Sequence, residues 1–395
     1  KIGMYLGGWY DRPLHDQVDG RIDDDAFDRA LDRIDAFEQE LVDDGALLLK
    51  FWIHIDRDAQ GKRLRELEQD PLTRWRVTER ERKTWQRYDL FAQATDRLLA
   101  RSGTAAAPWQ VVAGEDPNYR TLTIAGALGD AIGQRLAGEQ TRRAQTTFSA
   151  ELDDLPRVPN VLTRLDMGQQ LPKKDYRRQL EKYQGRLNQL AQRARAQRVS
   201  TILVFEGADA AGKGGAIQRL TGALEARDYQ VIPIAAPTDE EHAQHYLWRF
   251  WRHLPRAGRV AIFDRSWYGR VLVERIEDFA SRAEWQRAYA EINDFEQQLA
   301  YHGTVVVKYW IHIDRDEQLE RFKARQVTPY KRWKITDEDW RNREKWDHYE
   351  AAVDDMVAHT NTDFAPWILV EGNDKRFARV KVIRALCEQL ERVLK

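Results

Sequence analysis

The sequence predicts an α/β protein with a P-loop kinase-like, three-layer fold, in which a parallel sheet is flanked by helices on both faces. In the second half of the chain, apolar runs typical of buried strands alternate with amphipathic runs typical of helices, as in parallel sheets covered on both sides. A glycine-rich loop joins one such strand to a helix, and a long part of the pattern occurs twice. We therefore expect a tandem repeat of one module.

The glycine-rich loop has the spacing of a phosphate-binding loop. Gly207, Gly212 and Lys213 match G-x-x-x-x-G-K after an apolar run at 201–205. Glycines let successive N–H groups face phosphate oxygens, and the following helix adds the positive end of its dipole. An ordinary glycine-rich turn with an incidental lysine is the alternative, which the flanking strand and helix disfavour. The expected phosphate-binding positions are Gly207, Ala210, Ala211, Gly212, Lys213, Gly214 and Gly215.

Two aspartates are candidate magnesium ligands. Gly214 stands where the common form of this motif has the Ser or Thr that holds magnesium. Asp209 lies inside the loop, and Asp264 ends the apolar run at 260–264. Because the carboxyl ends of parallel strands meet at one edge, both carboxylates could hold a Mg²⁺ that bridges phosphates. The alternative for Asp264 is a helix N-cap.

The chain repeats itself at an offset of 258 residues. Residues 47–58 read LLLKFWIHIDRD and residues 305–316 read VVVKYWIHIDRD. The register holds without insertion over a span of about 130 residues, which indicates two copies of one module. The counterpart of 157–258, which carries the loop, would lie before Lys1. We therefore expect the native chain to continue upstream by about 100 residues.

The pattern predicts the following elements. In the first module, 1–136, we expect strands at 3–6, 46–55 and 109–113, and helices at 24–43, 59–68, 79–101 and 119–135. The polar stretch 137–160, which contains two prolines, is the expected linker. In the second module, 161–395, we expect a basic helix at 173–198, strands at 201–206, 230–235, 259–264, 304–313 and 367–371, and helices between them.

A basic cluster at 316–348 suggests a lid. Its cations include Arg321, Lys323, Arg325, Lys331 and Arg332. A charge run of this kind is usually a solvated helix surface. Here it falls between the fourth and fifth predicted strands, where nucleotide kinases keep a lid. Arginines on such a lid can stabilise charge on a transferring phosphoryl group.

The repeat offers an internal control on these assignments. At the positions of Asp264, Arg265 and Arg325, the first module has Leu6, Gly7 and Leu67, whereas tryptophans, prolines and apolar positions are kept. The comparison therefore predicts that the first module is degenerate and inactive, with surface drift as the alternative. The same comparison gives less support to Arg270 and Arg332, because arginine is retained at both positions.

Composition narrows the class of protein. The 395 residues carry a net charge of −1, which argues against a general nucleic-acid coat. The single cysteine rules out an internal disulfide and favours a reducing, cytoplasmic compartment. No apolar run approaches the ~20 residues needed to cross a bilayer, and no signal peptide is visible. We expect neither nucleic acid nor a membrane as partner.

The combined motifs resemble those of the polyphosphate kinase 2 family. The resemblance rests on FEGADAAGKGG at 205–215, FDRSWYGR at 263–270 and YLWRF at 246–250. It spans about 160–395 strongly and 1–136 as a degenerate copy. The tandem layout is similar to the fused, two-domain class, which implies phosphorylation of AMP to ADP by inorganic polyphosphate with Mg²⁺.

The resemblance implies roles for individual residues. Lys213 and the loop amides would hold the exchanged phosphates, while Asp209 and Asp264 would arrange magnesium. The arginines expected to steady the transferred group are Arg265, Arg270 and Arg325. Arg219 and the basic residues of the lid would line the path of the polyanion.

Other functions remain open at this point. The acceptor could be ADP or GDP, or the enzyme could be an ordinary ATP-using nucleotide kinase. A non-enzymatic polyphosphate-binding protein is a further alternative, although pure binding would not need Asp209, Lys213, Asp264 and Arg325 together. The first module is expected to have such a non-enzymatic role in any case, as a scaffold or dimer-forming half, and a homo-oligomer is expected.

Overall fold

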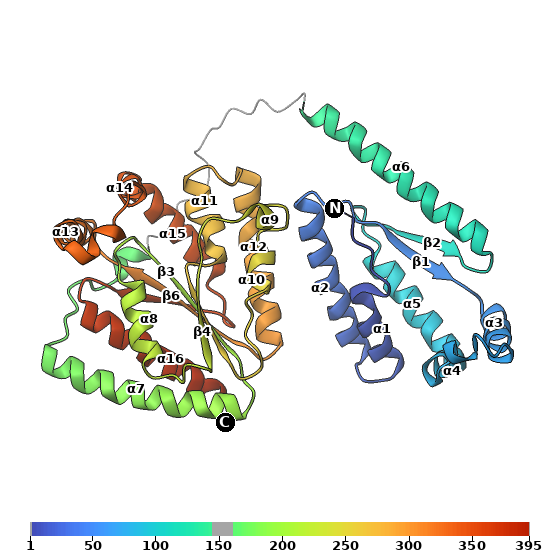
Figure 1. The fold of residues 1–395 in the computed structure, drawn as a ribbon, viewed down its shortest axis with the longest axis horizontal. Coiled ribbons are helices and arrows are strands. Elements are labelled where there is room, and N and C mark those ends of the chain that lie inside the picture. The colour runs from blue at the N-terminus through green and yellow to red at the C-terminus, as the bar shows by residue number, and fades with distance from the viewer. Residues whose placement is uncertain (1, 144–160, 395) are drawn as a thin grey trace. The chain divides into compact units, whose positions relative to one another are not determined.

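The computed structural model describes residues 2–143 and 161–394, which form two compact units, Lys1–Asp153 (unit 1) and Asp154–Lys395 (unit 2) (Figure 1). Each unit has its own sheet and its own apolar core. Among the described residues, no helix is both long enough and apolar enough to span a bilayer.

Unit 2 is built on a five-stranded parallel sheet. Its strands are β3 (Thr201–Gly207), β4 (Tyr229–Pro233), β5 (Val260–Asp264), β6 (Val305–His312) and β7 (Trp367–Glu371). Their order is β4-β5-β3-β6-β7, so β3 is central and its carboxyl end lies between those of β5 and β6. This confirms the predicted strands and the parallel sheet, and it places the glycine-rich loop where ligands bind in such sheets.

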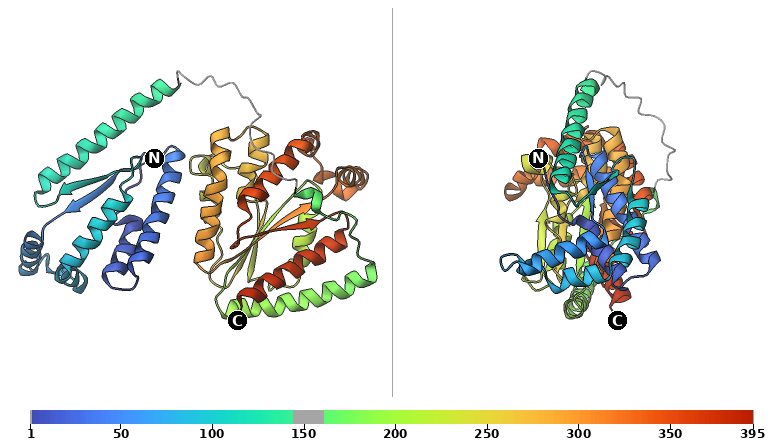
Figure 2. Two further views of the ribbon diagram at one scale, coloured as in Figure 1. Left: turned by 180° about the vertical axis from the view of Figure 1, so that it is seen from behind. Right: turned by 90° about the vertical axis from the view of Figure 1, so that its right-hand side faces the viewer.

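Helices cover both faces of this sheet, because alternate residues of β3 point in opposite directions. Ile202 and Val204 pack with α12 (Arg282–Tyr301) and α15 (Trp346–Thr360). Leu203 and Phe205 pack with α7 (Lys173–Ala196), α8 (Lys213–Thr221) and α16 (Lys375–Val393). Figure 2 shows the resulting three layers from behind, with α7 and α16 together on one side of the strands. The three-layer fold predicted for this module is confirmed.

The remaining elements of unit 2 are short or belong to the predicted lid. The short elements are η3 (Leu162–Arg164), α9 (Asp239–His242), α10 (Trp248–Trp251), η4 (Trp267–Val271) and α11 (Val273–Ile276). Between β6 and α15 the chain forms α13 (Arg315–Val327), η5 (Pro329–Lys334) and α14 (Asp337–Glu344). This helical excursion occupies the segment predicted to be the lid.

Unit 1 repeats the carboxyl-terminal half of this plan. Its elements are η1 (Gly8–Tyr10), α1 (Asp11–Val18), α2 (Asp24–Asp43), β1 (Lys50–His54), α3 (Arg57–Gln69), η2 (Arg74–Arg76), α4 (Glu79–Gln86), α5 (Tyr88–Ser102), β2 (Trp109–Ala113) and α6 (Pro117–Arg143). Strands β1 and β2 are parallel, with Lys50 opposite Trp109, as Lys308 is opposite Trp367 in unit 2. The repeat read from the sequence is therefore also a repeat in strand register.

The strand predicted at 3–6 is wrong. These residues are irregular, and Met4 and Leu6 are exposed. Their counterparts lie in β5, which hydrogen-bonds to β3 on one side and β4 on the other. The described part of unit 1 has no strands at those positions, so the run has no neighbours to pair with. For the same reason β1 begins only at Lys50, because the counterparts of 47–49 pair with β3.

Three other boundaries differ from the prediction. The helix predicted at 79–101 is two helices, because the chain breaks at Arg87 with φ −103°. Helix α1 was not predicted. Residues 137–143, assigned to the linker, continue α6. The rest of the predicted linker, 144–160, lies outside the described residues.

Both units contain the same buried ion-pair network. In unit 2, Lys308 Nζ lies 2.7 Å from Glu296 Oε2 and 2.8 Å from Tyr268 Oη, while Trp267 Nε1 donates to Glu296 Oε1 at 3.1 Å. Lys308 and Glu296 are fully buried. In unit 1, Lys50 Nζ lies 2.7 Å from Glu38 Oε2, at positions shifted by 258. Unit 1 keeps this network although it has Leu6 at the position of Asp264, so the network serves the fold. In unit 2 it anchors the turn after β5 to α12.

Candidate active site

The loop after β3 has a backbone that explains its glycines. Gly207 has φ +151°, and a Cβ there would lie 2.4 Å from the carbonyl oxygen of Ile311 on β6, so no side chain fits. Ala210 and Gly212 have φ +64° and +115°, in the left-handed region that glycine tolerates best. These turns reverse the chain so that α8 begins at Lys213. The N-terminus of α8 therefore faces the loop, as anion binding requires.

Lys213 and Gly214 lie at the open side of the loop. Lys213 Nζ donates to the carbonyl oxygen of Gly207 at 2.6 Å, so the ammonium folds over the loop. A Cβ on Gly214 would meet nothing within 4 Å. The position that carries Ser or Thr in the common motif is thus open space, and a metal at this loop would need other ligands.

Arg321 supports the loop through hydrogen bonds to backbone carbonyl groups, and we call this side chain the brace of the loop. Its Nη1 donates to the carbonyl oxygens of Ala210 and Ala211 at 2.9 and 2.8 Å. Its Nη2 donates to those of Gly372 and Asn373 at 2.7 and 2.9 Å. Its Nε donates to Glu317 Oε1 on the same helix, and the side chain is buried. The structure therefore corrects the expectation that Arg321 contacts phosphate, because its donors are already engaged by the protein.

This brace can be tested separately from the chemistry. Arg321→Met should lower kcat about tenfold or more, because four carbonyl groups lose a charged donor and the loop amides lose their fixed positions. Arg321→Lys should recover only part of kcat, since lysine cannot bridge both segments at once. Steady-state kinetics and the melting temperature would be measured together. Arg63→Met, at the counterpart position in unit 1, is the matched control and should leave kcat unchanged. A loss of activity that simply followed the loss of folded protein would contradict the brace.

Asp264 and Asp209 lie at adjacent strand ends. Asp264 is paired in register with Phe205, two residues before Gly207, and its carboxylate has no hydrogen bond or ion pair within 2–143 and 161–394. Asp209 Oδ2 accepts from Asn342 Nδ2 at 2.9 Å. In the part of the chain that the structure describes, no three acidic, histidine or cysteine side chains gather as a metal cage. Mg²⁺ needs only one or two carboxylates when phosphates and water complete its shell, and an unpaired carboxylate such as that of Asp264 fits this role.

Arg265 connects the two aspartates. Its φ is +66°, its N–H donates to the carbonyl oxygen of Phe205 at 3.1 Å, and its Nη2 lies 3.3 Å from Asp209 Oδ1. Burial alone would lower the pKa of Arg265, but the carboxylates around it, of which Asp209 acts most strongly, raise it. The guanidinium therefore remains charged beside the loop.

A pocket of about 810 Å³, partly open to solvent, adjoins the loop. Its polar end contains Asp209, Lys213 and Arg265, which the sequence predicted. Glu206 is buried there and accepts from Ser266 Oγ at 2.8 Å, and burial raises the pKa of its carboxyl group. The other lining side chains come from η3, the sheet, the η4–α11 region, the predicted lid and α15: Leu162, Leu272, Val273, Trp310, His312, Gln318, Glu338, Asn342, Trp346, Tyr349, Glu350 and Val353.

Several predicted residues do not line this pocket. Arg270 stacks on Tyr246 at 4.4 Å and faces Glu274 at 3.2 Å. The remaining basic positions also have local partners or lie on the excursion. Arg219 bonds to Gln218, Lys323 to Glu320 and Arg332 to the carbonyl oxygen of Gln326. Arg325 lies in the last turn of α13, and Lys331 lies in η5. Their proposed contacts with phosphate remain predictions.

The sequence reading missed polar residues that the predicted lid and α15 bring to the pocket. Asn342 binds Asp209, and Tyr349 Oη donates to Asn342 Oδ1 at 3.2 Å. Comparison of the two copies of the module could have identified these residues. At the positions of Glu338, Asn342, Tyr349 and Glu350, unit 1 has Arg80, Thr84, Phe91 and Ala92. At each of these positions unit 1 has a different side chain, as it does at the positions of Asp264 and Arg265. Trp310, His312 and Gln318 are kept as Trp52, His54 and Gln60.

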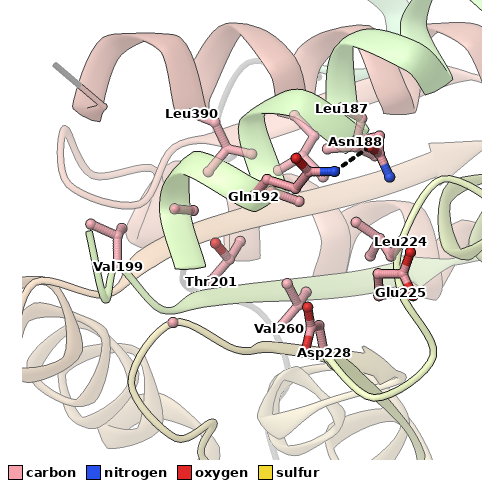
Figure 3. Close-up of a pocket in the computed structure, with 14 residues that line it drawn as sticks. Leu187, Asn188, Gln192, Val199, Thr201, Leu224, Glu225, Asp228, Val260 and Leu390 are labelled. Atoms are coloured by element: carbon pink, nitrogen blue, oxygen red, sulfur yellow. Dashed lines mark hydrogen bonds between the residues drawn. The ribbon is translucent and has the colours of Figure 1, made fainter. Parts of the chain in front are cut away.

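A second cavity lies at the opposite edge of the sheet and contains none of the predicted residues (Figure 3). Thr201 and Val260, at the beginnings of β3 and β5, form part of its floor. Most of its wall is aliphatic, and Asp228 at its rim pairs with Arg195 at 2.9 Å. It has no cluster of groups suited to phosphate chemistry.

The fold and the site together define a P-loop phosphotransferase. A glycine loop at a central strand end, a lysine opening the next helix and a carboxylate at the adjacent strand end are the parts that phosphoryl transfer requires. The family model described as Polyphosphate kinase 2 matches residues 1–140 and 170–395. The chain belongs to the polyphosphate kinase 2 family.

Named proteins are similar to this chain, and some of them align over its whole length. The polyphosphate:AMP phosphotransferase of Pseudomonas aeruginosa is 49% identical over 395 residues, which is 100% of this chain and 79% of that protein. The one from Acinetobacter johnsonii is 39% identical over 99% of this chain and 79% of its own length. A crystal structure of a putative polyphosphate kinase 2 from P. aeruginosa superimposes with a TM-score of 0.84 at 47% identity, covering 98% of this chain and 76% of that one. The GDP-polyphosphate phosphotransferase of Mycolicibacterium smegmatis is 40% identical over 53% of this chain and 74% of its own length.

Proposed function

We propose that the chain transfers a phosphoryl group from inorganic polyphosphate to AMP, giving ADP, with Mg²⁺ as the metal. The observation that carries the proposal is the pocket beside the loop, where unit 1 has different residues at the positions of Arg265, Asn342 and Tyr349. The relatives that align over the whole chain are named for AMP, which favours AMP over ADP or GDP as acceptor.

The pocket lining contains both kinds of group that a nucleoside monophosphate needs. Lys213 and Arg265 beside the loop could bind the α-phosphate. Apolar and aromatic side chains that suit a purine ring, including Trp346 and Leu272, also line the pocket. Trp310 also lines the pocket, and within the described ranges its buried Nε1–H has no acceptor. A buried donor of this kind is costly unless a ligand satisfies it.

In the proposed step, an α-phosphate oxygen of AMP attacks the terminal phosphorus of polyphosphate. The bond from that phosphorus to its bridging oxygen breaks, which leaves ADP and a polyphosphate one unit shorter. No covalent intermediate with the protein is needed. Lys213, Arg265 and the loop amides compensate the charge that builds on the transferred group, and the pocket fixes the approach of the two reactants.

Asp264 and Asp209 would hold Mg²⁺. The cation would neutralise charge on the phosphates and orient them. Asp264 is suited to this because its carboxylate has no partner in the described residues. Asp209 is held by Asn342 and Arg265, which would fix its carboxylate in one orientation.

The direct test is to incubate the protein with polyphosphate, Mg²⁺ and AMP, and to follow ADP by chromatography. Parallel reactions contain ADP or GDP as acceptor, or ATP as donor in place of polyphosphate. ADP formed only with AMP and polyphosphate supports the proposal. If ATP or GTP formed preferentially, the acceptor would be ADP or GDP and the proposal of AMP would be wrong. Nucleotide phosphorylation that needs ATP as the donor would overturn the proposal.

The acceptor pocket makes a separate prediction. Asn342→Thr, which installs the residue found in unit 1, removes the amide that orients Asp209 and should raise KM for AMP about tenfold. Its effect on KM for polyphosphate should be small. The reciprocal change in unit 1, Thr84→Asn, is the matched control and should leave both constants unchanged. Equal effects on both substrates would argue against an acceptor role for this pocket.

A further inference from the structure

Arg379 is a cation on α16 that lies beside the first turn of α8. A Cβ built on Gly215 would stand 3.1 Å from Arg379 Nη2, so the guanidinium occupies the space that a side chain at 215 would need. Within residues 2–143 and 161–394, Arg379 forms no hydrogen bond and no ion pair. It is also absent from the pocket that we assign to the acceptor.

Arg379 differs from three other cations of its helix, each of which has an acidic partner among the described residues. Arg376 pairs with Asp374 at 3.2 Å, Lys381 with Glu371 at 2.6 Å and Arg384 with Glu388 at 3.7 Å. These residues are neutralised by neighbouring acids. Arg379 instead faces another positive element.

The charges around Arg379 repel it. The N-terminus of α8 is the positive end of a helix dipole, where a cation is unfavourable and an anion is favourable. Arg321 lies nearby under the loop. Burial lowers the pKa of Arg321, and the charges of Arg325 and Arg379 lower it further against the opposing effect of Glu317. Such a cluster becomes favourable when a polyanion lies between its members.

The repeat supports a chemical role for this position. Unit 1 has Thr121 at the counterpart of Arg379, just as it has Leu6 and Leu67 at the counterparts of Asp264 and Arg325. It keeps Arg63 at the counterpart of the loop brace Arg321. Arg379 therefore follows the pattern of the residues assigned to phosphate chemistry.

We propose that Arg379 binds the donor polyphosphate on the α16 side of the loop, at a phosphate unit beyond the one transferred. This rests on the proposed function. The acceptor pocket is lined by residues of the other face, such as Leu272 and Val353, which belong to the core packed on α12 and α15. Arg379 comes from α16, which packs with α8 on the opposite face. The phosphate loop therefore lies between the acceptor pocket and Arg379. For this reason we assign the donor, and not the acceptor, as the ligand of Arg379.

The direction of the donor chain follows from the helix geometry. Residues 215 and 219 are one turn apart and share a face of α8. Arg219 therefore lies one turn beyond Gly215 on the face that Arg379 approaches. A polyphosphate that ends at Lys213 would extend past Gly214 and Gly215, which have no side chains, toward Arg379 and then Arg219.

The test compares Arg379→Thr, the residue of unit 1, with the wild-type chain. KM for long-chain polyphosphate should rise about tenfold to a hundredfold, as expected for loss of a charge-assisted contact. KM for AMP should stay within about twofold. Arg376→Thr and Arg384→Thr, which change surface cations of the same helix, are matched controls and should leave KM for polyphosphate unchanged.

Direct binding of fluorescently labelled polyphosphate by anisotropy gives a second readout that needs no acceptor. The affinity of Arg379→Thr should fall by the same factor, and its dependence on salt concentration should be shallower, because one fewer cation meets the polyanion. If no acceptor were phosphorylated but this affinity still fell, the binding role would stand while the proposed reaction failed. Unchanged affinity with melting temperature intact, or an effect confined to KM for AMP, would overturn the role of Arg379.

Discussion

Lys213→Met should reduce the rate of ADP formation by about 10²–10³-fold or more while leaving the protein folded. The ammonium is the mobile positive charge at the open side of the loop, and it folds over the Gly207 carbonyl oxygen at 2.6 Å. Charge that develops on the transferred phosphoryl group would lose its closest cation, and groups of this kind contribute several kcal/mol to transition-state stabilisation. Methionine keeps the length of the stem, so packing changes little.

Single-turnover kinetics with saturating polyphosphate and AMP would measure the loss in the chemical step. Lys381→Met is the control, because Lys381 is a part-buried lysine of the same unit that is paired with Glu371 at 2.6 Å. It should retain activity. Retention of near wild-type turnover by Lys213→Met would remove the basis for placing the reaction at this loop.

Lys308→Met should destabilise unit 2 by about 3–5 kcal/mol, since breaking one side of a buried ion pair leaves the other charge uncompensated. Glu296 would keep its donors Trp267 and Tyr268 but lose the ammonium at 2.7 Å. Burial lowers the pKa of Lys308 and raises the pKa of Glu296, so each group tolerates its buried position only because of the other. Replacing both partners by apolar residues should recover much of the loss.

Hydrogen exchange measured on peptides from each unit would localise the effect. Lys50→Met should loosen unit 1 in the same way, because Lys50 lies 2.7 Å from Glu38 in the matching network. Lys62→Met, an exposed lysine 4.0 Å from Glu66, should change little. Equal protection in Lys308→Met and the wild type would show that the network does not hold the fold together.

The parts of the site that could be predicted are those encoded locally. The spacing of Gly207, Gly212 and Lys213 fixes a backbone that turns into a helix, and the structure gives two of these residues the positive φ values that glycine allows. Asp264 could be placed because an apolar strand ends at it. Residues of the predicted lid and α15 that reach the pocket, such as Asn342 and Tyr349, have no local motif, and only comparison of the two units distinguishes them.

The predictions for residues 3–6 and for Arg321 were wrong for the same reason, because each depended on partners that are distant in the sequence. Residues 3–6 have the composition of a strand, but a strand forms only when neighbours accept and donate its backbone hydrogen bonds. Arg321 shares a helix face with Arg325, so its charge suggested phosphate. Its actual partners are carbonyl groups about 50 and 110 residues away in the sequence.

The sequence alone determined the parallel sheet, the phosphate loop, the tandem repeat and the loss of acidic and basic positions from the first copy. These depend on periodicity, glycine backbone freedom and residue identity, which are local or comparative properties of the chain. Only the tertiary structure decided which cations have partners among the described residues. Arg321 is engaged under the loop, whereas Arg379 has no partner in the part of the chain that the structure describes. The distances between groups far apart in the chain are set by how the helices pack on the sheet.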